Sequence, residues 1–388
     1  MIDVAVVGAG IIGHNHAAAV LRHPRLRLAA VIDPVRSARE KLAERFAKEW
    51  GADPPEEYDT LSEALVAGPV GLVAVCTPTG LHADVAEEAL AAGRHVLIEK
   101  PVDVSLPRAR RLAALATEAE ARGVLSTVVS QHRFDPASVA VARAVREGRL
   151  GRLTSAVASV AWWRAQSYYD SAAWRGTWAL DGGGALMNQG VHTVDLLAWL
   201  LGRPVEVFAH TGRLAHETIE VEDVAVATVR FDSGALAVLH ATTAAYPGLS
   251  VRLQVHGSAG SAVLHDDQLE YFHVAADGSG ATGGPLGGAE PDNQAPQVVP
   301  ATELRGTRKP DDAFVLGHLR QYQDVVEALD ERRPPAVSLA DGLTAMAIVR
   351  AVYLSAHVGR PVDVGEVLDG KYDGVITPIE ASPADGES

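Results

Sequence analysis

The sequence predicts an α/β protein with two domains of different construction. In the first part of the chain, up to residue 130, short apolar segments alternate with longer amphipathic ones, which is typical of parallel strands joined by helices. Between residues 205 and 272, apolar segments follow one another with short turns, which indicates an antiparallel sheet. A chain of 388 residues also exceeds one ordinary core, so its length alone favours two domains.

The composition excludes several classes of partner. The formal net charge is −15 and no basic block occurs, which argues against nucleic acid and anionic membranes. No apolar run approaches the ~20 residues of a membrane span, and Met1-Ile2-Asp3-Val4 does not begin a signal peptide. The single cysteine, Cys76, cannot form an internal disulfide, which suits a reducing compartment. We therefore expect a soluble, cytoplasmic protein.

A glycine-rich loop follows the first predicted strand. Residues 2–7 read as a buried strand that runs into Gly8-Ala9-Gly10-Ile11-Ile12-Gly13 and then a helix from about residue 14 to 22. In this pattern the first glycine makes a tight turn, the second lets a pyrophosphate approach and the third lets the helix pack on the strand. The loop therefore predicts dinucleotide binding, with a purely structural turn as the alternative.

An acid at the end of the second predicted strand supports this interpretation. Strand 28–32 ends at Asp33, twenty residues after Gly13, the spacing at which a carboxylate accepts hydrogen bonds from an adenosine ribose. A carboxylate there also repels a 2′-phosphate, which favours NAD over NADP. Arg36 keeps NADP open as the less favoured cofactor.

The third strand of this domain, residues 70–75, ends in a second polar loop. Cys76-Thr77-Pro78-Thr79-Gly80 and the following His82 could line the ribose and nicotinamide of the cofactor. The alternative is a capped turn before the next helix. The other expected elements are helices 35–49, 60–67, 81–92 and 105–122 and strands 95–98 and 124–130.

The strand at 95–98 ends in two charges and a proline, Glu99-Lys100-Pro101. Five lysines stand against twenty-nine arginines in this chain, so a lysine here indicates a function that a guanidinium cannot perform. An amine can exchange a proton, whereas arginine stays charged. The alternative is an ordinary ion pair at an exposed strand end.

The second domain begins with helix 137–147 and strand 153–163, followed by an aromatic segment. Five of the six tryptophans lie between residues 162 and 199, and Trp163 and Tyr169 are expected to wall a sugar pocket, with a local core as the alternative. Gly182-Gly183-Gly184 then leads into helix 185–201, on which Asn188, His192 and Asp195 share one face. His192 could also be an ordinary helical histidine.

The rest of the chain alternates strands and turns before ending in helices. Asp232-Ser233-Gly234 reads as a hairpin turn, residues 274–310 as a long loop, and residues beyond 368 as a disordered tail. The expected strands are 205–213, 221–231, 235–243, 250–257 and 262–272, and the expected helices are 312–331 and 339–358.

Taken together, these stretches resemble the glucose–fructose oxidoreductase, inositol dehydrogenase and rhizopine-catabolism (Gfo/Idh/MocA) family. Four motifs carry the resemblance over residues 1 to 260, and Gln131-x-Arg133-Phe134 and Glu222-Asp223 are minor matches. The motifs are Gly8-x-Gly10-x-x-Gly13, Thr77-Pro78-x-x-x-His82, Glu99-Lys100-Pro101, and Gly182-Gly183-Gly184-x-x-x-Asn188-x-Gly190-x-His192-x-x-Asp195.

The resemblance implies a Rossmann domain over residues 1–133 and an α/β domain with an open, largely antiparallel sheet over 134–367, with 368–388 as the tail. It implies NAD(P)-dependent redox chemistry on the secondary alcohol of a sugar, glycoside or cyclitol. In such proteins the open sheet often forms the interface of a homo-oligomer, so a dimer or tetramer is expected.

The resemblance also assigns roles to residues. Lys100 and His192 match the catalytic pair, and Asn188 is expected to contact substrate together with Trp163 and Tyr169. No metal is expected, and the peptide before Pro101 is expected to be cis. The residues expected at the cofactor are Gly8, Gly10, Ile11, Ile12, Gly13, Asp33, Thr77, Pro78, Thr79, His82, Glu99, Gln131, Trp174 and Arg175.

One position departs from the inositol dehydrogenase pattern, which has aspartate where this chain has Asn188. Because an amide cannot ionise, His192 must rely on another partner, for which Asp195 is the candidate. Two other functions remain open at this point: a nucleotide-sensing protein that has lost its chemistry, and a metal-dependent sugar isomerase or lyase that uses His192 and Asp195.

Overall fold

The computed structural model describes residues 1–275 and 292–375, which divide into two compact units. Unit 1 contains residues 1–131, 179–182 and 311–343, and unit 2 contains the remainder. The expected boundary at residue 133 lies two residues from this division. The expected second domain is not one continuous segment, however, because 179–182 and 311–343 pack into unit 1. Parts of the expected loop and tail, 276–291 and 376–388, lie outside the described residues.

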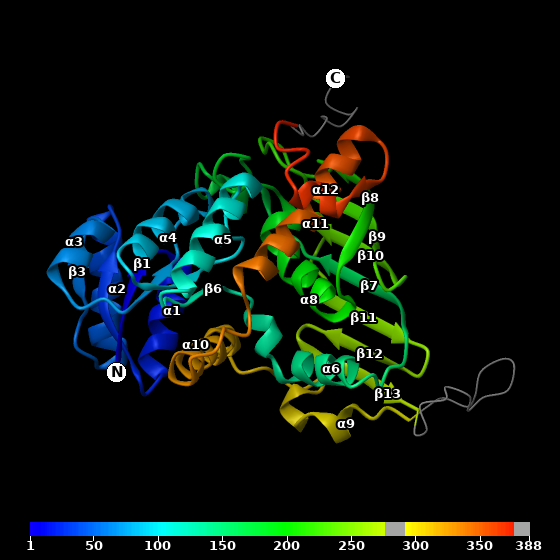
Figure 1. Ribbon diagram of the computed structural model, residues 1–388, viewed down its shortest axis with the longest axis horizontal. Helices are drawn as coiled ribbons and strands as arrows, with labels where there is room; N and C mark the ends of the chain where they lie inside the picture. The colour runs from blue at the N-terminus through cyan, green and yellow to red at the C-terminus, as the bar shows by residue number, and fades with distance from the viewer. Residues whose placement is uncertain (276–291, 376–388) are drawn as a thin grey trace, which may run out of the picture. The chain divides into compact units, whose positions relative to one another are not determined.

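Unit 1 is built on a six-stranded parallel sheet, as the alternation of apolar and amphipathic segments predicts (Figure 1). The strand order is β3-β2-β1-β4-β5-β6. The chain adds β2 and β3 on one side of β1 and β4, β5 and β6 on the other, so the loops after β1 and β4 lie side by side at the carboxyl ends of the strands. The short edge strand β3 was not expected, because its sequence Glu-Glu-Tyr lacks an apolar run. The strands are β1 (Ile2–Val7), β2 (Leu26–Ile32), β3 (Glu56–Tyr58), β4 (Leu72–Val75), β5 (His95–Ile98) and β6 (Ser126–Val128).

Helices connect these strands, and their starts follow local capping chemistry. Thr60 and Glu63 form a reciprocal capping box at the start of α3, and the Ser105 hydroxyl accepts from the Arg108 N–H at the start of α5. Helix α1 begins at Ile11 rather than near residue 14, inside the glycine-rich loop itself. The helices are α1 (Ile11–Arg22), α2 (Arg36–Trp50), α3 (Leu61–Ala67), α4 (His82–Ala91), α5 (Leu106–Glu120) and α10 (Ala313–Glu331).

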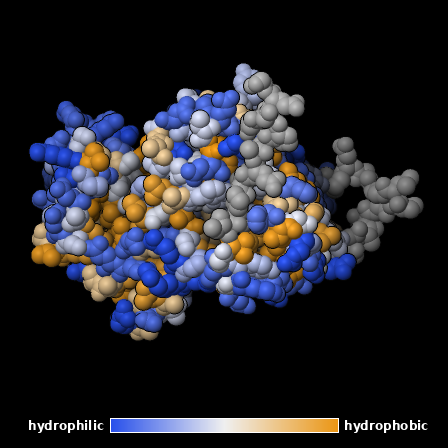
Figure 2. Space-filling view, turned by 90° about the horizontal axis from the view of Figure 1, so that it is seen from above, coloured by the Kyte–Doolittle hydropathy of each residue, from blue (hydrophilic) through white to orange (hydrophobic). Residues whose placement is uncertain are grey.

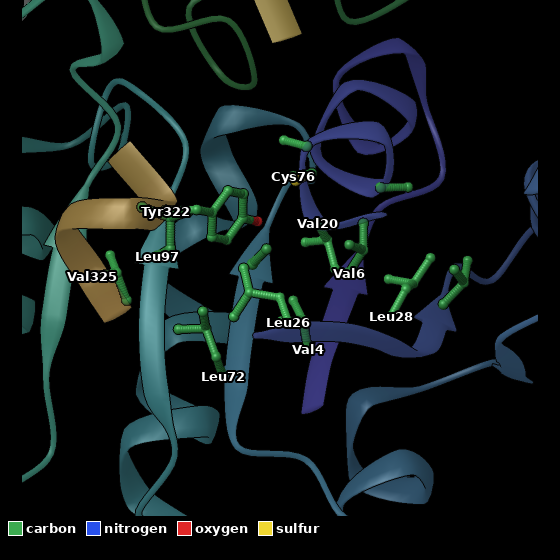
Figure 3. Packing of buried hydrophobic residues seen from close by; sticks show 14 of the residues in the cluster. Val4, Val6, Val20, Leu26, Leu28, Leu72, Cys76, Leu97, Tyr322 and Val325 are labelled. Carbon is green, nitrogen blue, oxygen red and sulfur yellow. The ribbon is translucent and has the colours of Figure 1, made fainter. Parts of the chain in front are cut away.

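Helix α10 completes the core of unit 1 although it lies some two hundred residues further along the chain. Figure 3 shows Tyr322 and Val325 of α10 beside Leu97 of β5, with Leu72 and Val6 in the same cluster, and all five are buried. Truncating one such leucine to alanine typically costs about 2–5 kcal/mol of stability. The core of unit 1 therefore includes a helix that lies outside the expected Rossmann domain of residues 1–133.

Unit 2 is built on an eight-stranded mixed sheet in the order β13-β12-β11-β7-β10-β9-β8-β14. Every pairing is antiparallel except that of β7 with β10, so the predicted open, largely antiparallel sheet is confirmed. The strands are β7 (Leu153–Ala161), β8 (Pro204–Gly212), β9 (Val224–Phe231), β10 (Leu236–Thr242), β11 (Val251–Gly257), β12 (Gly260–His265), β13 (Gln268–Val274) and β14 (Val362–Asp363).

The single strand expected at 262–272 is wrong, since the structure forms a hairpin there. Strands β12 and β13 pair antiparallel around Asp266 and Asp267, whose φ angles are 49° and 61°. Two successive residues with positive φ define a tight two-residue turn, and aspartate tolerates that conformation better than most residues. The turn expected at Asp232-Ser233-Gly234 is confirmed between β9 and β10, with Gly234 at φ 86°.

The single helix expected at 185–201 is also wrong in part. Residues Ala185–Gly190 form a π-helix, and the α-helix α8 occupies only Val191–Leu201. π-helical turns are rare and are frequent at functional sites. The other helices of unit 2 are α6 (Pro136–Arg146), α7 (Gln166–Asp170), α9 (Ala295–Val298) and α12 (Val364–Leu368).

Helix α11 (Leu339–Val358) is long and apolar enough to cross a membrane, contrary to the expectation that no such run exists. Its apolar window is 61% buried inside the protein, however, which is equally typical of a core helix.

Apolar side chains also reach the surface, where they lie among hydrophilic ones on the face seen in Figure 2. In unit 2, exposed apolar residues occupy register partners on one face of the sheet, for example Val238 of β10 and Val157 of β7. The exposed apolar residues of this face are Val157, Phe208, Val226, Leu236 and Val238.

Candidate functional site

The loop from Gly8 to Gly13 links β1 to α1, and two of its glycines are required by close contacts. Gly8 has φ 104°, and a β-carbon on it would lie 2.5 Å from the Cys76 carbonyl oxygen. A β-carbon on Gly13 would lie 2.0 Å from the Gly8 carbonyl oxygen. The loop is thus tight against its own backbone and against the loop after β4, as the spacing predicts.

The middle of this loop is open, which fits a dinucleotide. A β-carbon on Gly10 would meet no atom within 4 Å, and Ile11 is 76% exposed. Gly10, the N-cap of α1, has no side chain that could cap the helix, so the first N–H groups of α1 are available to an anion. The neighbouring Thr77 hydroxyl is buried and has no hydrogen-bond partner among the described residues. These features suit a pyrophosphate and a ribose.

Asp33 is held in place at the end of β2. Its Oδ2 accepts from the Ala9 N–H over 2.9 Å, and its Oδ1 accepts from the Val35 N–H over 2.8 Å. Each carboxylate oxygen has a further lone pair, so ribose hydroxyls can still donate to it. Arg36, the residue that would favour a 2′-phosphate, pairs instead with Glu40 over 2.8 Å. The arrangement favours NAD.

His82 connects the loops that follow β4 and β5. The ring is buried, with Nδ1 2.8 Å from the Pro101 carbonyl oxygen and Nε2 2.9 Å from that of Thr77. Burial lowers the pKa of His82, although the two carbonyls and nearby acids oppose this. Both ring nitrogens are therefore used by the backbone, and His82 positions the Thr77-Pro78 loop beside the cis peptide Lys100-Pro101, which was expected.

Lys100 follows β5 directly, at the carboxyl end of the sheet. Burial lowers the pKa of its amine, while the charges of Glu99 and Asp181 act in the opposite direction. An ammonium with a lowered pKa is a stronger acid and exchanges its proton more readily. This environment fits the property for which a lysine, and not an arginine, was expected here.

Glu99 is held by the protein itself. Its Oε1 lies 3.1 Å from His16 Nε2 and 3.2 Å from His318 Nε2, and its Oε2 accepts from the Lys100 backbone N–H over 3.0 Å. The expected contact of Glu99 with the cofactor stays a prediction. Gln131, also expected at the cofactor, is buried against Gly317 of α10.

In unit 2, the π-helix carries Asn188 and leads into α8, which carries His192. The His192 ring packs edge-on against His132 at 5.0 Å between centroids, and His132 is paired with Asp135 over 2.9 Å. Both Asp195 oxygens accept from the Arg133 guanidinium, over 2.6 and 2.7 Å. Asp195 therefore forms a bidentate ion pair with Arg133, and its role as a partner of His192 stays a prediction.

Glu222 fixes the start of the π-helix. Its carboxylate accepts from the Gly184 and Leu186 N–H groups, each over 2.8 Å, and from the Tyr353 hydroxyl over 3.1 Å. Burial raises the pKa of Glu222 to about 7, although these hydrogen bonds lower it. The glycine run before Asn188 is thus clamped rather than flexible.

The two aromatic residues expected to wall a sugar pocket have different surroundings. Tyr169 is buried, and its hydroxyl lies 2.8 Å from that of Thr243, so it belongs to a local core. Trp163 is half-buried beside Tyr246, with ring centroids 5.3 Å apart. Tyr169 thus contributes to a local core, and contact of either residue with a sugar stays a prediction.

Trp174 and Arg175, also expected at the cofactor, form a stack. The Arg175 guanidinium lies 4.6 Å from the Trp174 ring and 4.4 Å from that of Tyr168. Its Nε is buried and has no hydrogen-bond partner among the described residues. Their contact with a cofactor stays a prediction, as does the meeting of Lys100 in unit 1 with His192 in unit 2.

A large cavity of about 930 Å³ lies at the other end of the unit 1 sheet. Its lining includes Ile2 and His95, which begin β1 and β5. Asp33 and Lys100 follow the opposite ends of their strands, so this cavity is not the dinucleotide site.

Sequence reasoning missed the partners that hold these residues. The sequence assigned no partner to Glu99, and His318, Tyr322 and Tyr353 were not singled out. No local pattern connects residue 318 with residue 99, so only the packed structure identifies this pair. For Glu222, its place beside Asp223 before a strand was a weak signal.

Comparison with known proteins agrees with the geometry. Residues 2–127 match the family described as "Oxidoreductase family, NAD-binding Rossmann fold", and residues 138–263 match "GFO/IDH/MocA C-terminal domain". Inositol 2-dehydrogenase of Rhizobium meliloti (strain 1021) is 27% identical over 368 residues, which cover 92% of this chain and 98% of that protein.

Solved structures show the same fold. The WlbA dehydrogenase of Bordetella pertussis, in complex with NADH and UDP-GlcNAcA, has a TM-score of 0.78 and 30% identity, covering 93% of this chain and 97% of that one. Levoglucosan dehydrogenase in complex with NADH and levoglucosan also has a TM-score of 0.78, covering 94% and 99%; at 21% identity it supports the fold alone. The glycine-rich loop, the Glu99-Lys100-Pro101 turn and both matched domains lead to one conclusion: the chain belongs to the Gfo/Idh/MocA family of NAD-binding oxidoreductases.

Proposed function

We propose that this protein is an NAD-dependent dehydrogenase that interconverts a secondary alcohol and a ketone on a sugar, glycoside or cyclitol. The observation that carries the proposal is the Lys100 amine, which follows β5 at the cofactor end of the sheet and whose pKa is lowered by burial. The relatives support the substrate class, since those compared act, by name, on inositol or bind a sugar nucleotide.

The reaction requires two transfers from the alcohol. Bound NAD supplies a hydride acceptor at its nicotinamide ring. In the proposed role, His192 takes the hydroxyl proton, because an imidazole titrates near neutral pH. The Lys100 ammonium donates a hydrogen bond to the same oxygen and stabilises the negative charge that develops on it. In the reverse direction, the same two groups polarise the ketone and return the proton.

The chain's own residues also set the cofactor preference. Asp33 is fixed by the Ala9 and Val35 N–H groups and is available to ribose hydroxyls, while its charge disfavours a 2′-phosphate. Asn188 is proposed to hydrogen-bond a substrate hydroxyl, which an amide can do without changing its charge.

Homo-oligomerisation through the open sheet of unit 2 forms part of the proposal. The exposed apolar side chains on its outer face, among them Phe208, Leu236 and Val238, support it, because such faces are commonly covered by a second copy.

A spectrophotometric screen tests the function directly. Free sugars, cyclitols and glycosides are each incubated with the protein and NAD, in parallel with NADP, and reduction is followed at the nicotinamide absorbance band. We expect NAD-dependent turnover of at least one polyol or sugar, and a matched Lys100→Ala preparation excludes a contaminating dehydrogenase. NAD binding without turnover of any compound of these classes would contradict the proposal and favour a sensor.

A further inference from the structure

A buried hydrogen-bonded network lies behind Lys100 and joins three elements of unit 1. Helix α1 contributes His16, β5 is followed by Glu99, and α10 contributes His318 and Tyr322. All four side chains are at most 7% exposed. The two imidazoles pack edge-on at 4.7 Å between centroids, and each directs its Nε2 at the same oxygen, Glu99 Oε1.

The hydrogen-bond partners determine where the protons lie. His318 Nδ1 is 2.9 Å from the Phe314 carbonyl oxygen, which can only accept, so this nitrogen carries a proton. His318 Nε2 is 3.2 Å from a carboxylate oxygen of Glu99, which also requires a proton on the nitrogen. Both contacts are hydrogen bonds at the same time only in the imidazolium form of the His318 ring.

His16 needs only one proton. Its Nδ1 lies 2.8 Å from the Tyr322 hydroxyl, which can donate to it, so a proton on Nε2 alone satisfies both of its contacts. Burial lowers the pKa of His16, which agrees with a neutral ring, and raises the pKa of Tyr322, which keeps the hydroxyl protonated. Burial acts against ionisation of Glu99, but the hydrogen bonds from His16 and His318 hold the pKa of this carboxyl well below its ordinary value.

The network therefore contains one anion, Glu99, and one cation, His318. The positive charge of His318 offsets part of the effect of the Glu99 charge, which acts to raise the Lys100 pKa, and the second oxygen of Glu99 accepts from the Lys100 backbone N–H. We propose that His318 is a positioning residue that offsets the charge of Glu99 and orients it, so that Glu99 holds the Lys100 backbone while acting only weakly as a counter-charge of the Lys100 amine.

The inference rests on the proposed function, in which the Lys100 ammonium faces the reacting oxygen. An uncompensated Glu99 carboxylate would stabilise the ammonium and make it a weaker acid. With His318 present, the ammonium stays more acidic and donates a stronger hydrogen bond to a developing alkoxide. The other titratable groups of unit 1 that act on Glu99, Tyr322 or Lys100 are Cys76, whose thiol burial keeps neutral, His82 and Asp181.

The lysine amine can be titrated directly, because the chain has only five lysines, Lys41, Lys48, Lys100, Lys309 and Lys371. In the full chain labelled with ¹³C at lysine Cε, the NMR shift of each lysine is followed against pH, and Lys100→Arg assigns the relevant signal. For His318→Gln, which keeps a donor to Glu99 but removes the positive charge, we expect the Lys100 pKa to rise by about one unit. The other four lysines should not change.

A matched control lies on the same helix interface. His23 is also buried, and its Nε2 is 2.8 Å from the Gln323 side-chain oxygen of α10. His23→Gln removes a buried imidazole against α10 without touching Glu99, so it should leave the Lys100 titration unchanged. An unchanged titration in folded His318→Gln, or an equal shift in both variants, would overturn the inference.

A measurement on the unaltered protein covers the case in which His318→Gln does not fold. The ¹⁵N shifts of the His318 ring should show both nitrogens protonated at neutral pH. A neutral ring would overturn the inference. So would one bound metal ion per chain, found by elemental analysis and lost with chelator, because the nitrogens and oxygen of His16, Glu99 and His318 lie within 4.8 Å of one another.

These readouts separate the inference from the proposed function. Neither the lysine titration nor the histidine shifts require turnover, so they test His318 even if no substrate is found. With a substrate, the alkaline limb of the kcat profile should move upward in His318→Gln by the same amount as the Lys100 titration. A shifted titration with an unshifted limb would support the role of His318 and refute that of Lys100 in turnover.

Discussion

Gly184 lies directly on the backbone of Glu222. A β-carbon added at Gly184 would be 1.7 Å from the Glu222 carbonyl oxygen, while the Gly184 N–H donates to the Glu222 carboxylate over 2.8 Å. This contact holds the first residues of the π-helix that carries Asn188. Because the close contact joins the backbone of Gly184 to the backbone of Glu222, neither residue can move away without displacing the main chain.

Gly184→Ala should therefore destabilise unit 2 severely. The new methyl group would force the π-helix off Glu222, and we expect the free energy of unfolding to fall by about 3 kcal/mol or more. Urea denaturation measures the loss. Gly374→Ala is the control, because a β-carbon there would meet no atom within 4 Å. Equal stability of the two variants would contradict the clamp.

The stability of the protein should depend on the charge of Glu222. Burial raises the pKa of this carboxyl from 4.5 to about 7, so the folded state binds an extra proton between these values. Stability should then fall as the pH rises from 4.5 to about 7, by at most about 3 kcal/mol.

The glutamine in Glu222→Gln cannot titrate. As the pH rises from 4.5 to about 7, the free energy of unfolding of the unaltered protein should therefore fall relative to that of the variant. Denaturation at a series of pH values measures the difference, and Glu118→Gln, at an exposed carboxyl, serves as the control. Parallel curves for the two proteins would show that Glu222 is ionised throughout.

Gly10→Ala should separate cofactor binding from folding. A methyl group at Gly10 meets open space in the protein, so stability should change little, but it would occupy the position where the pyrophosphate approaches. We expect NAD to bind at least about tenfold more weakly, measured by calorimetry, with a thermal unfolding curve close to that of the unaltered protein. Unchanged affinity would place the pyrophosphate elsewhere.

Asp33→Ser should reduce the preference for NAD. It removes the carboxylate that accepts from ribose hydroxyls and repels a 2′-phosphate, and it also frees the Ala9 N–H. We expect the ratio of kcat/KM for NAD to that for NADP to fall by roughly tenfold or more. Asp53→Ser, at an exposed loop acid, is the control. A constant ratio would mean that another group selects the cofactor.

Lys100→Ala and Lys100→Arg should both abolish most turnover. Alanine removes the donor, whereas arginine keeps the charge but cannot match the amine in position or acidity. We expect kcat to fall by roughly 10²–10⁴-fold in both while the NAD dissociation constant stays about the same. Lys371→Ala, a surface lysine paired with Glu366, should behave as the unaltered protein does. Full activity of either Lys100 variant would refute its assignment.

Much of the fold of unit 1 could be predicted from the sequence, because each of its strands and turns is specified by residues close together in the chain. Buried parallel strands need continuous apolar runs, and the turns at their ends need glycine at fixed spacing, so β1, the Gly8–Gly13 loop and Asp33 are each readable within about thirty residues. The same holds for the Lys100-Pro101 turn after β5 and for the hairpin at Gly234. The residues proposed to perform chemistry were therefore found without coordinates.

What supports those residues was decided by tertiary packing. The clamp on Glu99 uses His16 and His318, some three hundred positions apart, and the clamp on Gly184 uses Glu222 and Tyr353. The π-helix before His192 and the bidentate pair of Asp195 with Arg133 also arise from contacts between distant segments. The physical reason is that the hydrogen-bond partners of a buried charge come from the helices and strands that pack around it in the folded protein. That closure depends on the whole fold and leaves no periodic trace along the chain.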